Sequence, residues 1–167
     1  MKVFYRLAFW SFSLVTLVAS AQFAHAANKG HITLQTIVQK ESFSLDEKGK
    51  EKRELIPAGT VTPGEEVIYT IFFTNIDKQP VEGVEIVDHI PTNTLYKAES
   101  AFGPGTAIKF SVDGGANFDS PENLRVALDD GTVRPATPSD YSHVRWQYQS
   151  PLLAGQRGYV RFRAIVK

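Results

Sequence analysis

Residues 63–75 read Pro63-Gly64-Glu65-Glu66-Val67-Ile68-Tyr69-Thr70-Ile71-Phe72-Phe73-Thr74-Asn75, and this stretch decides the fold. The opening Pro-Gly pair is typical of a turn, because proline presets one backbone angle and glycine tolerates the next. The side chains that follow alternate with a period of two, as in a strand with a buried face. The other side of this segment carries Ile68 and Phe72. We therefore expect the strand to lie centrally in its sheet.

A second extended segment follows this strand and ends at Pro91. Val84 and Ile86 restart the alternation, and a proline after Ile90 cannot continue a central ladder. Two short polar side chains, Asn75 and Asp88, bracket the loop between the segments. Such side chains hydrogen-bond nearby backbone NH groups. Alternatively they could bind Ca²⁺ together with Asp77, although the spacing matches no known calcium loop.

The first 26 residues have the features of a secretory signal peptide. Lys2 and Arg6 form a basic start, residues 7–21 are apolar and uncharged, and Ala24-His25-Ala26 supplies small residues for a cleavage site. The apolar run is too short to span a bilayer comfortably. We predict an exported, periplasmic or extracellular protein, with a signal peptide over 1–26, one domain over 27–167, and no integral membrane segment after cleavage.

Composition excludes several classes of function. The chain has 18 Lys and Arg and 18 Asp and Glu. Two of the basic residues leave with the signal peptide, so this near-neutral balance argues against nucleic-acid binding. There is no cysteine, which excludes disulfides, thiolate catalysis and Cys-ligated metals. Stability must therefore come from burial, for which the chain has 11 Phe, 6 Tyr and 2 Trp.

Further short alternating segments occur at 32–38, 108–112, 124–128, 144–148 and 160–166. Turn sequences separate them, among them Asp113-Gly114-Gly115, and Gly155 marks the turn before the last segment. No segment after the signal peptide has a sustained helical period. We predict an all-β protein: an immunoglobulin-like antiparallel β-sandwich of about seven to nine strands. In the first segment, Ile32, Leu34 and Val38 are predicted to be buried.

Residues 46–54 carry eight charges among nine residues. The segment could be an electrostatic contact loop. The simpler interpretation is a solvated hairpin tip that turns at Gly49, because runs of charge usually face water.

Three stretches together carry a family resemblance. They are Val61-x-Pro63-Gly64-x-x-Val67-x-Tyr69-x-Ile71-x-x-x-Asn75, then Gly83-Val84-x-Ile86-x-Asp88-x-Ile90-Pro91, then Val144-x-Trp146 with Leu153-Ala154-Gly155-x-x-Gly158-x-Val160-x-Phe162. This pattern resembles the "conserved repeat" domain of unknown function of bacterial and archaeal surface proteins. The resemblance covers residues 32–167. It implies an immunoglobulin-like domain outside the cytoplasm with a structural or adhesive role and no catalytic residues. The family's domains often occur in tandem, whereas this chain holds one copy.

Within this pattern we assign structural roles to a set of residues. Tyr69 and Trp146 are large rings that would fill the space between two sheets. Ser111-x-Asp113-x-Gly115-x-x-Phe118 resembles the Asp-box hairpin of sialidases, in which the aspartate ties a turn. The full predicted structural set is Pro63, Gly64, Tyr69, Asn75, Asp88, Pro91, Asp113, Gly115, Trp146 and Gly155.

Histidines are the only candidate nitrogen ligands for a metal. His31, His89 and His143 each lie near a predicted strand end, so two of them could meet at one end of the sandwich, although none has motif spacing. Cleavage before His25 would instead give an N-terminal histidine, which resembles copper carriers and copper monooxygenases. We expect no metal and no cofactor, with a copper protein or oxidative enzyme as the alternative.

The last two predicted strands supply the candidate binding residues, Arg145, Tyr159, Arg161 and Arg163. If Trp146 and Phe162 point inward, these side chains point outward, and we expect them to lie on adjacent strands. They form either a basic binding patch or a surface ion-pair ladder in which Glu85 pairs with Arg145. The final strand could also accept a partner strand along its edge.

The sequence thus predicts a non-catalytic module of the cell envelope that acts through surface contacts. Its partner would be an envelope or surface protein or a glycan, and not a nucleic acid.

Overall fold

The computed structural model describes residues 32–167. The predicted signal peptide, His25 and His31 lie outside this range. The described strands are β1 (Ile32–Leu45), β2 (Glu51–Pro57), β3 (Glu66–Asn75), β4 (Glu85–His89), β5 (Thr94–Tyr96), β6 (Thr106–Ser111), β7 (Arg125–Ala127), β8 (Val133–Pro135), β9 (His143–Tyr148) and β10 (Arg157–Val166), with one 3₁₀ turn, η1 (Pro138–Asp140).

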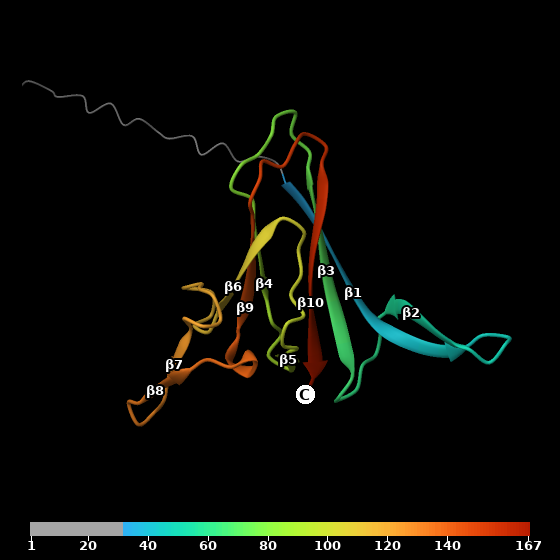
Figure 1. The fold of residues 1–167 in the computed structure, drawn as a ribbon, viewed down its shortest axis with the longest axis horizontal. Helices are drawn as coiled ribbons and strands as arrows, with labels where there is room; N and C mark the ends of the chain where they lie inside the picture. The colour runs from blue at the N-terminus through green and yellow to red at the C-terminus, as the bar shows by residue number, and fades with distance from the viewer. Residues whose placement is uncertain (1–31) are drawn as a thin grey trace, which may run out of the picture.

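Two antiparallel sheets face each other (Figure 1). One has the order β2-β1-β3-β10-β5 and the other the order β4-β9-β6, while β7 and β8 form a separate hairpin. The chain is an immunoglobulin-like antiparallel β-sandwich, as predicted. Strand β3 lies between β1 and β10, which confirms its predicted central position. With the short β7–β8 pair, the described chain has ten strands, more than the seven to nine expected.

The core lies between the sheets and is rich in aromatic side chains. Trp146, Val144, Val160, Phe162 and Leu152 have no exposed surface. Tyr69 stacks on Phe162 with ring centroids 4.8 Å apart. The period-two pattern therefore places one face of β3, β9 and β10 in this core. The core-filling roles predicted for Tyr69 and Trp146 are confirmed.

The turns predicted from glycine and proline are also present. Gly64 has a φ of +90°, and its amide donates to the carbonyl oxygen of Val166 at 2.9 Å. Gly155 has a φ of +71° in the connection that leads to β10. The amide of Thr94 donates to the carbonyl oxygen of Pro91 at 2.8 Å, which closes the turn before β5. These positive angles explain why glycine is used in the first two turns.

Strand β1 departs from the prediction in its burial. Leu34 and Val38 are paired with Phe73 and Tyr69, so they lie on the inner face of the sheet. Nevertheless 58% of Leu34 and 39% of Val38 is exposed. The prediction of burial is wrong for these two residues because they stand on a strand near the edge of the wider sheet, which the three-stranded sheet leaves uncovered.

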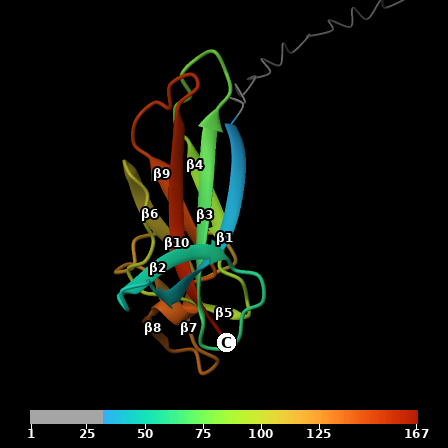
Figure 2. The ribbon, with the colours of Figure 1, turned by 90° about the vertical axis from the view of Figure 1, so that its right-hand side faces the viewer.

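Strands β1 and β2 extend beyond the sandwich as a twisted hairpin (Figures 1 and 2). We call residues 41–55 of this hairpin the arm. Its tip turns at Gly49, which has a φ of +74°, and every residue of β2 is exposed. The predicted solvated hairpin tip is therefore confirmed, and the strand before it is longer than the alternation indicated.

Strand β10 is not an edge. It pairs with β3 along Arg157–Ile165 and with β5 along Ala164–Val166, and Arg161 forms a bridge with Phe102. The predicted strand addition at β10 is therefore wrong, because both of its sides already have hydrogen-bonded partners. Among the described strands of the two sheets, the free edges belong to β2, β4, β6 and β5.

Candidate functional site

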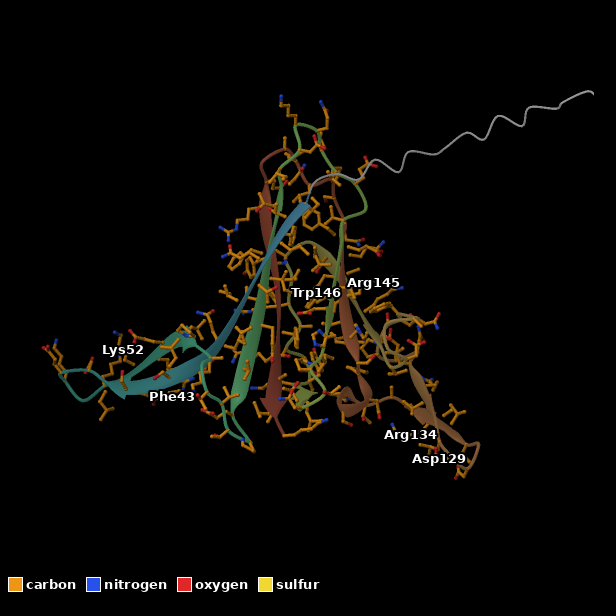
Figure 3. The ribbon with its side chains drawn as sticks, turned by 180° about the vertical axis from the view of Figure 1, so that it is seen from behind. Phe43, Lys52, Asp129, Arg134, Arg145 and Trp146 are labelled. Carbon is orange, nitrogen blue, oxygen red and sulfur yellow. The ribbon has the colours of Figure 1, made fainter. Side chains whose placement is uncertain are left out.

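The four residues predicted to form one binding patch lie on two different sheets. Tyr159, Arg161 and Arg163 alternate along β10 and share the outer face of the five-stranded sheet. Arg145 belongs to β9 in the other sheet, on the opposite side of the sandwich from the arm (Figure 3). The single patch is therefore a wrong prediction. Strands β9 and β10 are consecutive in sequence, but residues 149–156 carry the chain from one sheet to the other.

Arg145 has a local structural role. Its guanidinium lies 3.8 Å from the carboxylate of Glu85 and 4.7 Å from the ring centre of Phe118. The pairing with Glu85 was predicted as one of two alternatives, and β4 does lie beside β9, with Ile86 opposite Trp146. A cation that already has a carboxylate and a ring as partners is a poor candidate for binding a further anion.

Arg163 is also neutralised. Its guanidinium donates to Glu41 at 2.8 Å and to Glu66 at 2.5 Å, and Lys97 makes a further ion pair with Glu66. Burial alone would raise the pKa of Glu66, but the hydrogen bonds from Arg163 and Lys97 outweigh burial and leave that pKa below its ordinary value. At this end of the outer face, surface ion pairs are present, as in one of the two alternatives that the sequence left open, but the acids come from β1 and β3 and were not predicted.

The other end of the outer face has a different chemistry. Phe72, Tyr159 and Phe102 form a row across neighbouring segments, with ring centroids 6.2 and 6.1 Å apart. Arg157 lies 4.2 Å from the ring centre of Phe72, and Arg161 lies 5.3 Å from that of Phe102. Neither arginine has an ion pair with any residue between 32 and 167. We call these five residues the aromatic–arginine row.

A shallow groove of about 250 Å³ runs beside this row. The arm forms one of its walls through Leu55, and Figure 2 looks onto this face of the sheet. A charged hollow next to the groove shares Leu55 with it and is also lined by Glu41, Arg53, Glu54 and Arg163. Its lining residues are Ile37, Gln39, Leu55, Thr70, Phe72, Tyr159 and Arg161.

Sequence reasoning missed three members of the row, namely Phe72, Phe102 and Arg157. For Phe72 a signal existed, since a phenylalanine on the outer side of a strand with Thr70 and Thr74 as its outer neighbours is exposed unless something covers it. No pattern in the sequence indicated Phe102, because a single β-bridge with Arg161, distant in the chain, places it beside the row. Arg157 precedes the alternating run that defined the last strand, so its place on the sheet was not evident.

Asn75 and Asp88 both bind backbone amides, as predicted. The side-chain oxygen of Asn75 accepts from the amide of Asp77 at 2.9 Å, and Asp88 accepts from the amide of His89 at 2.9 Å. Burial raises the pKa of Asp88, and the hydrogen bond from His89 offsets this only in part. Within residues 32–167 no three His, Asp or Glu side chains are placed to hold a metal ion.

The Asp113 loop is a tied hairpin turn. Its carboxylate accepts hydrogen bonds from the amide of Asn117, the hydroxyl of Ser111 and the side chain of Asn117, which hold the pKa of Asp113 well below its usual range. Gly115 has a φ of +89°, and a Cβ there would lie 3.4 Å from the His143 ring. The predicted structural role of this loop is confirmed.

Two of the candidate histidines meet, as the prediction allowed. His89 and His143 are opposite each other in the β4–β9 pair, and their ring centroids are 6.4 Å apart. The imidazole Nδ1 of His143 lies 3.1 Å from the hydroxyl of Ser142, and 67% of the His89 side chain is exposed. The remaining candidates, His25 and His31, fall outside the described residues.

Comparison with known proteins found no matching family model, no matching curated protein and no matching solved structure. Within the described part of the chain, no helix has the length and apolar character needed to cross a bilayer. The geometry of the sandwich is therefore the basis for a functional proposal.

Proposed function

We propose that this protein is an exported, non-catalytic binding module that docks an acidic protein segment on the outer face of its five-stranded sheet. The observation that carries the proposal is the pair Arg157 and Arg161. Arg157 lies over the half-buried ring of Phe72 and Arg161 over the exposed ring of Phe102, and neither arginine has a carboxylate partner among residues 32–167. Arg163, on the same strand, has two. An incoming carboxylate could therefore pair with Arg157 or Arg161 without displacing a carboxylate of this chain.

The composition of the row also fits a protein contact. Tyrosine, arginine and other aromatic residues are enriched at the energetic centres of protein interfaces, where they combine apolar area with a polar end. Phe102 is 44% exposed and Tyr159 is 36% exposed, so burial by a partner would remove apolar surface from water.

An acidic peptide fits this groove better than a glycan does. Ile37 and Leu55 form an aliphatic wall beside the rings, and apart from the Tyr159 hydroxyl the uncharged polar groups of the lining belong to Gln39 and Thr70. A sugar chain presents hydroxyl groups that need many polar partners when they are buried. A peptide with carboxylates and apolar side chains would instead match both the arginines and the aliphatic wall.

Selection from a random peptide display library tests the proposal. The full mature chain is the bait, and the double charge reversal Arg157→Glu with Arg161→Glu is the comparison. We expect selected peptides rich in Asp and Glu that bind the double variant at least about tenfold more weakly, and whose affinity falls with salt. The matched control is Lys78→Glu with Arg125→Glu, which makes the same change in net charge at exposed positions outside the groove and should retain binding.

Peptides without acidic enrichment, or with equal affinity for the double variant, would contradict the proposal. Binding of an acidic polysaccharide such as hyaluronate, with the same sensitivity to the double variant, would assign the row to a glycan. Circular dichroism of each variant shows whether the sandwich is intact.

Export is tested by the intact mass of protein recovered from its own envelope fraction. We expect a chain that begins at Ala27 and carries no metal. A chain that begins at His25 with one bound copper ion would instead support the copper protein that the sequence left as the alternative.

A further inference from the structure

A second hollow, separate from the groove, opens between the two sheets. It lies where β5, the edge of the wide sheet, faces β6, an edge of the narrow one. Its volume is about 430 Å³, within the range of small-molecule sites. We call it the edge cleft, and its lining residues are Tyr96, Ala98, Glu99, Ala101, Ile108, Phe110, Pro121, Pro138 and Tyr141.

Three aromatic rings line the edge cleft on its inner side. Phe110 stacks on Tyr141 with ring centroids 4.5 Å apart, and Tyr96 lies 5.1 Å from Phe110 and 5.7 Å from Tyr141. All three residues belong to the core, so their positions are fixed by packing. The amide of Ala101 donates to the Tyr96 hydroxyl at 3.0 Å, which holds the loop beside the cleft. The site is therefore already formed in the free protein.

The charge around these rings is negative. Glu99 is the only charged residue among those that line the cleft, and it has no ion pair with residues 32–167. Burial raises the pKa of Tyr96 and of Tyr141, and negative charge adds to the shift: Glu99 acts on Tyr96, while Asp140 and Glu122 act on Tyr141. Asp140 is neutralised by Arg134, with both guanidinium–carboxylate contacts at 2.6–2.7 Å. Among residues 32–167, Glu122, like Glu99, has no such partner.

From this geometry we propose that the edge cleft binds a small organic cation, in which an ammonium group is attached to an apolar body. The faces and hydroxyls of aromatic rings attract such a cation, and quaternary ammonium groups are recognised by clustered rings in this way. Glu99 supplies the opposite charge at the cleft, and Pro121, Pro138 and Ile108 supply apolar walls.

A matched pair of ligands tests the proposal. Choline and 3,3-dimethylbutan-1-ol have nearly the same shape, but only choline is charged. Each is titrated into the full mature chain while amide NMR shifts are recorded. We expect choline to produce saturable shifts at Tyr96, Ala101 and Tyr141 and the alcohol to bind at least about threefold more weakly. Glu99→Gln should weaken choline binding by about threefold to tenfold and leave the alcohol unaffected.

Two further variants make the outcome decisive. Glu122→Gln should weaken choline binding in the same direction, and Glu82→Gln, an exposed residue in the turn before β4, should not. Equal binding of the alcohol and choline would overturn the proposal. So would a choline titration that produces no saturable shifts at the cleft. Since the edge cleft shares no residue with the groove, failure of this test leaves the acidic-segment proposal standing.

Discussion

Asn75 ties two loops to the end of β3 although its side chain is fully buried. Its amide nitrogen donates to the carbonyl oxygens of Gln79 and Leu152 at 2.8 and 2.9 Å, and its oxygen accepts from the amide of Asp77. Asn75→Ala would leave these three backbone groups without this partner. We expect a loss of about 2–4 kcal/mol in the free energy of unfolding, measured by urea denaturation.

Asn123→Ala is the control for this change. Asn123 is exposed, and its side chain donates one hydrogen bond, to Asp119 at 3.3 Å. We expect a change within about 0.5 kcal/mol. Equal urea midpoints for the two variants would show that the buried hydrogen bonds of Asn75 do not stabilise the fold.

Glu99 is the one non-glycine residue of the described chain with a positive φ, at +59°. An L-residue with a Cβ is disfavoured there by about 1–2 kcal/mol, whereas glycine is not. Glu99→Gly should therefore raise the free energy of unfolding by about 0.5–1 kcal/mol while it removes the carboxylate from the edge cleft. A variant that is more stable and binds choline less well is the expected result. A less stable variant would mean that the side chain contributes packing that outweighs the backbone strain.

At the scale of elements, strands β3 and β10 pair closely where the ring of Phe73 lies over the backbone of Gly158. A Cβ on Gly158 would lie 2.3 Å from the ring of Phe73, its partner in the register. Gly158→Ala should cost about 1–3 kcal/mol of unfolding free energy because the ring must move within a packed core. Adding Phe73→Leu should recover part of that cost. Strictly additive effects in this double-mutant cycle would contradict the steric explanation.

The arm is an element with little burial of its own. Phe43 is 57% exposed and Leu45 is 72% exposed, and a two-stranded hairpin alone is marginally stable. Ser42 and Glu54 are register partners, so an Asn-Gly turn can replace residues 43–53. We expect the free energy of unfolding of the shortened chain to lie within about 1 kcal/mol of the parent value, because few buried contacts are lost. A larger loss in urea denaturation would show that the arm supports the sheet.

For the whole molecule, the positions of the strands in the sequence were predictable. Which strands pair with each other was predictable only in part. Alternation is local, so β3, β9 and β10 could be located from residues such as Val144 and Val160. The sheet to which each strand belongs depends on pairing across the chain, for example between β10 and β3. The wrong prediction of one patch that joins Arg145 and Arg161 has this origin. The edge cleft was not found because η1 and β5 meet only after the sandwich closes.

The described molecule as a whole should lose stability in acid. Hydrogen bonds or ion pairs lower the pKa of Glu65, Glu66, Asp113, Asp119, Asp130 and Asp140 below the ordinary values of 4.5 and 3.8. A carboxyl with a lower pKa in the folded state adds stability above its unfolded pKa, and this is lost as the pH falls. We therefore expect similar urea midpoints at pH 7 and pH 6, and a falling midpoint below about pH 4.5.

Two variants separate the contributions to this acid profile. Asp140→Asn removes a carboxyl whose pKa is lowered in the folded state, so stability should depend less steeply on pH. The variant also loses the ion pair between Asp140 and Arg134. Asp88→Asn removes the aspartate whose pKa burial holds above its ordinary value despite the hydrogen bond from His89. The charged form of Asp88 opposes folding above its unfolded pKa, so this variant should gain stability at pH 7 and gain less at pH 3. A midpoint that rises on acidification of the parent protein would contradict the assignment, because it would mean that buried carboxyls such as Asp88 outweigh the paired ones.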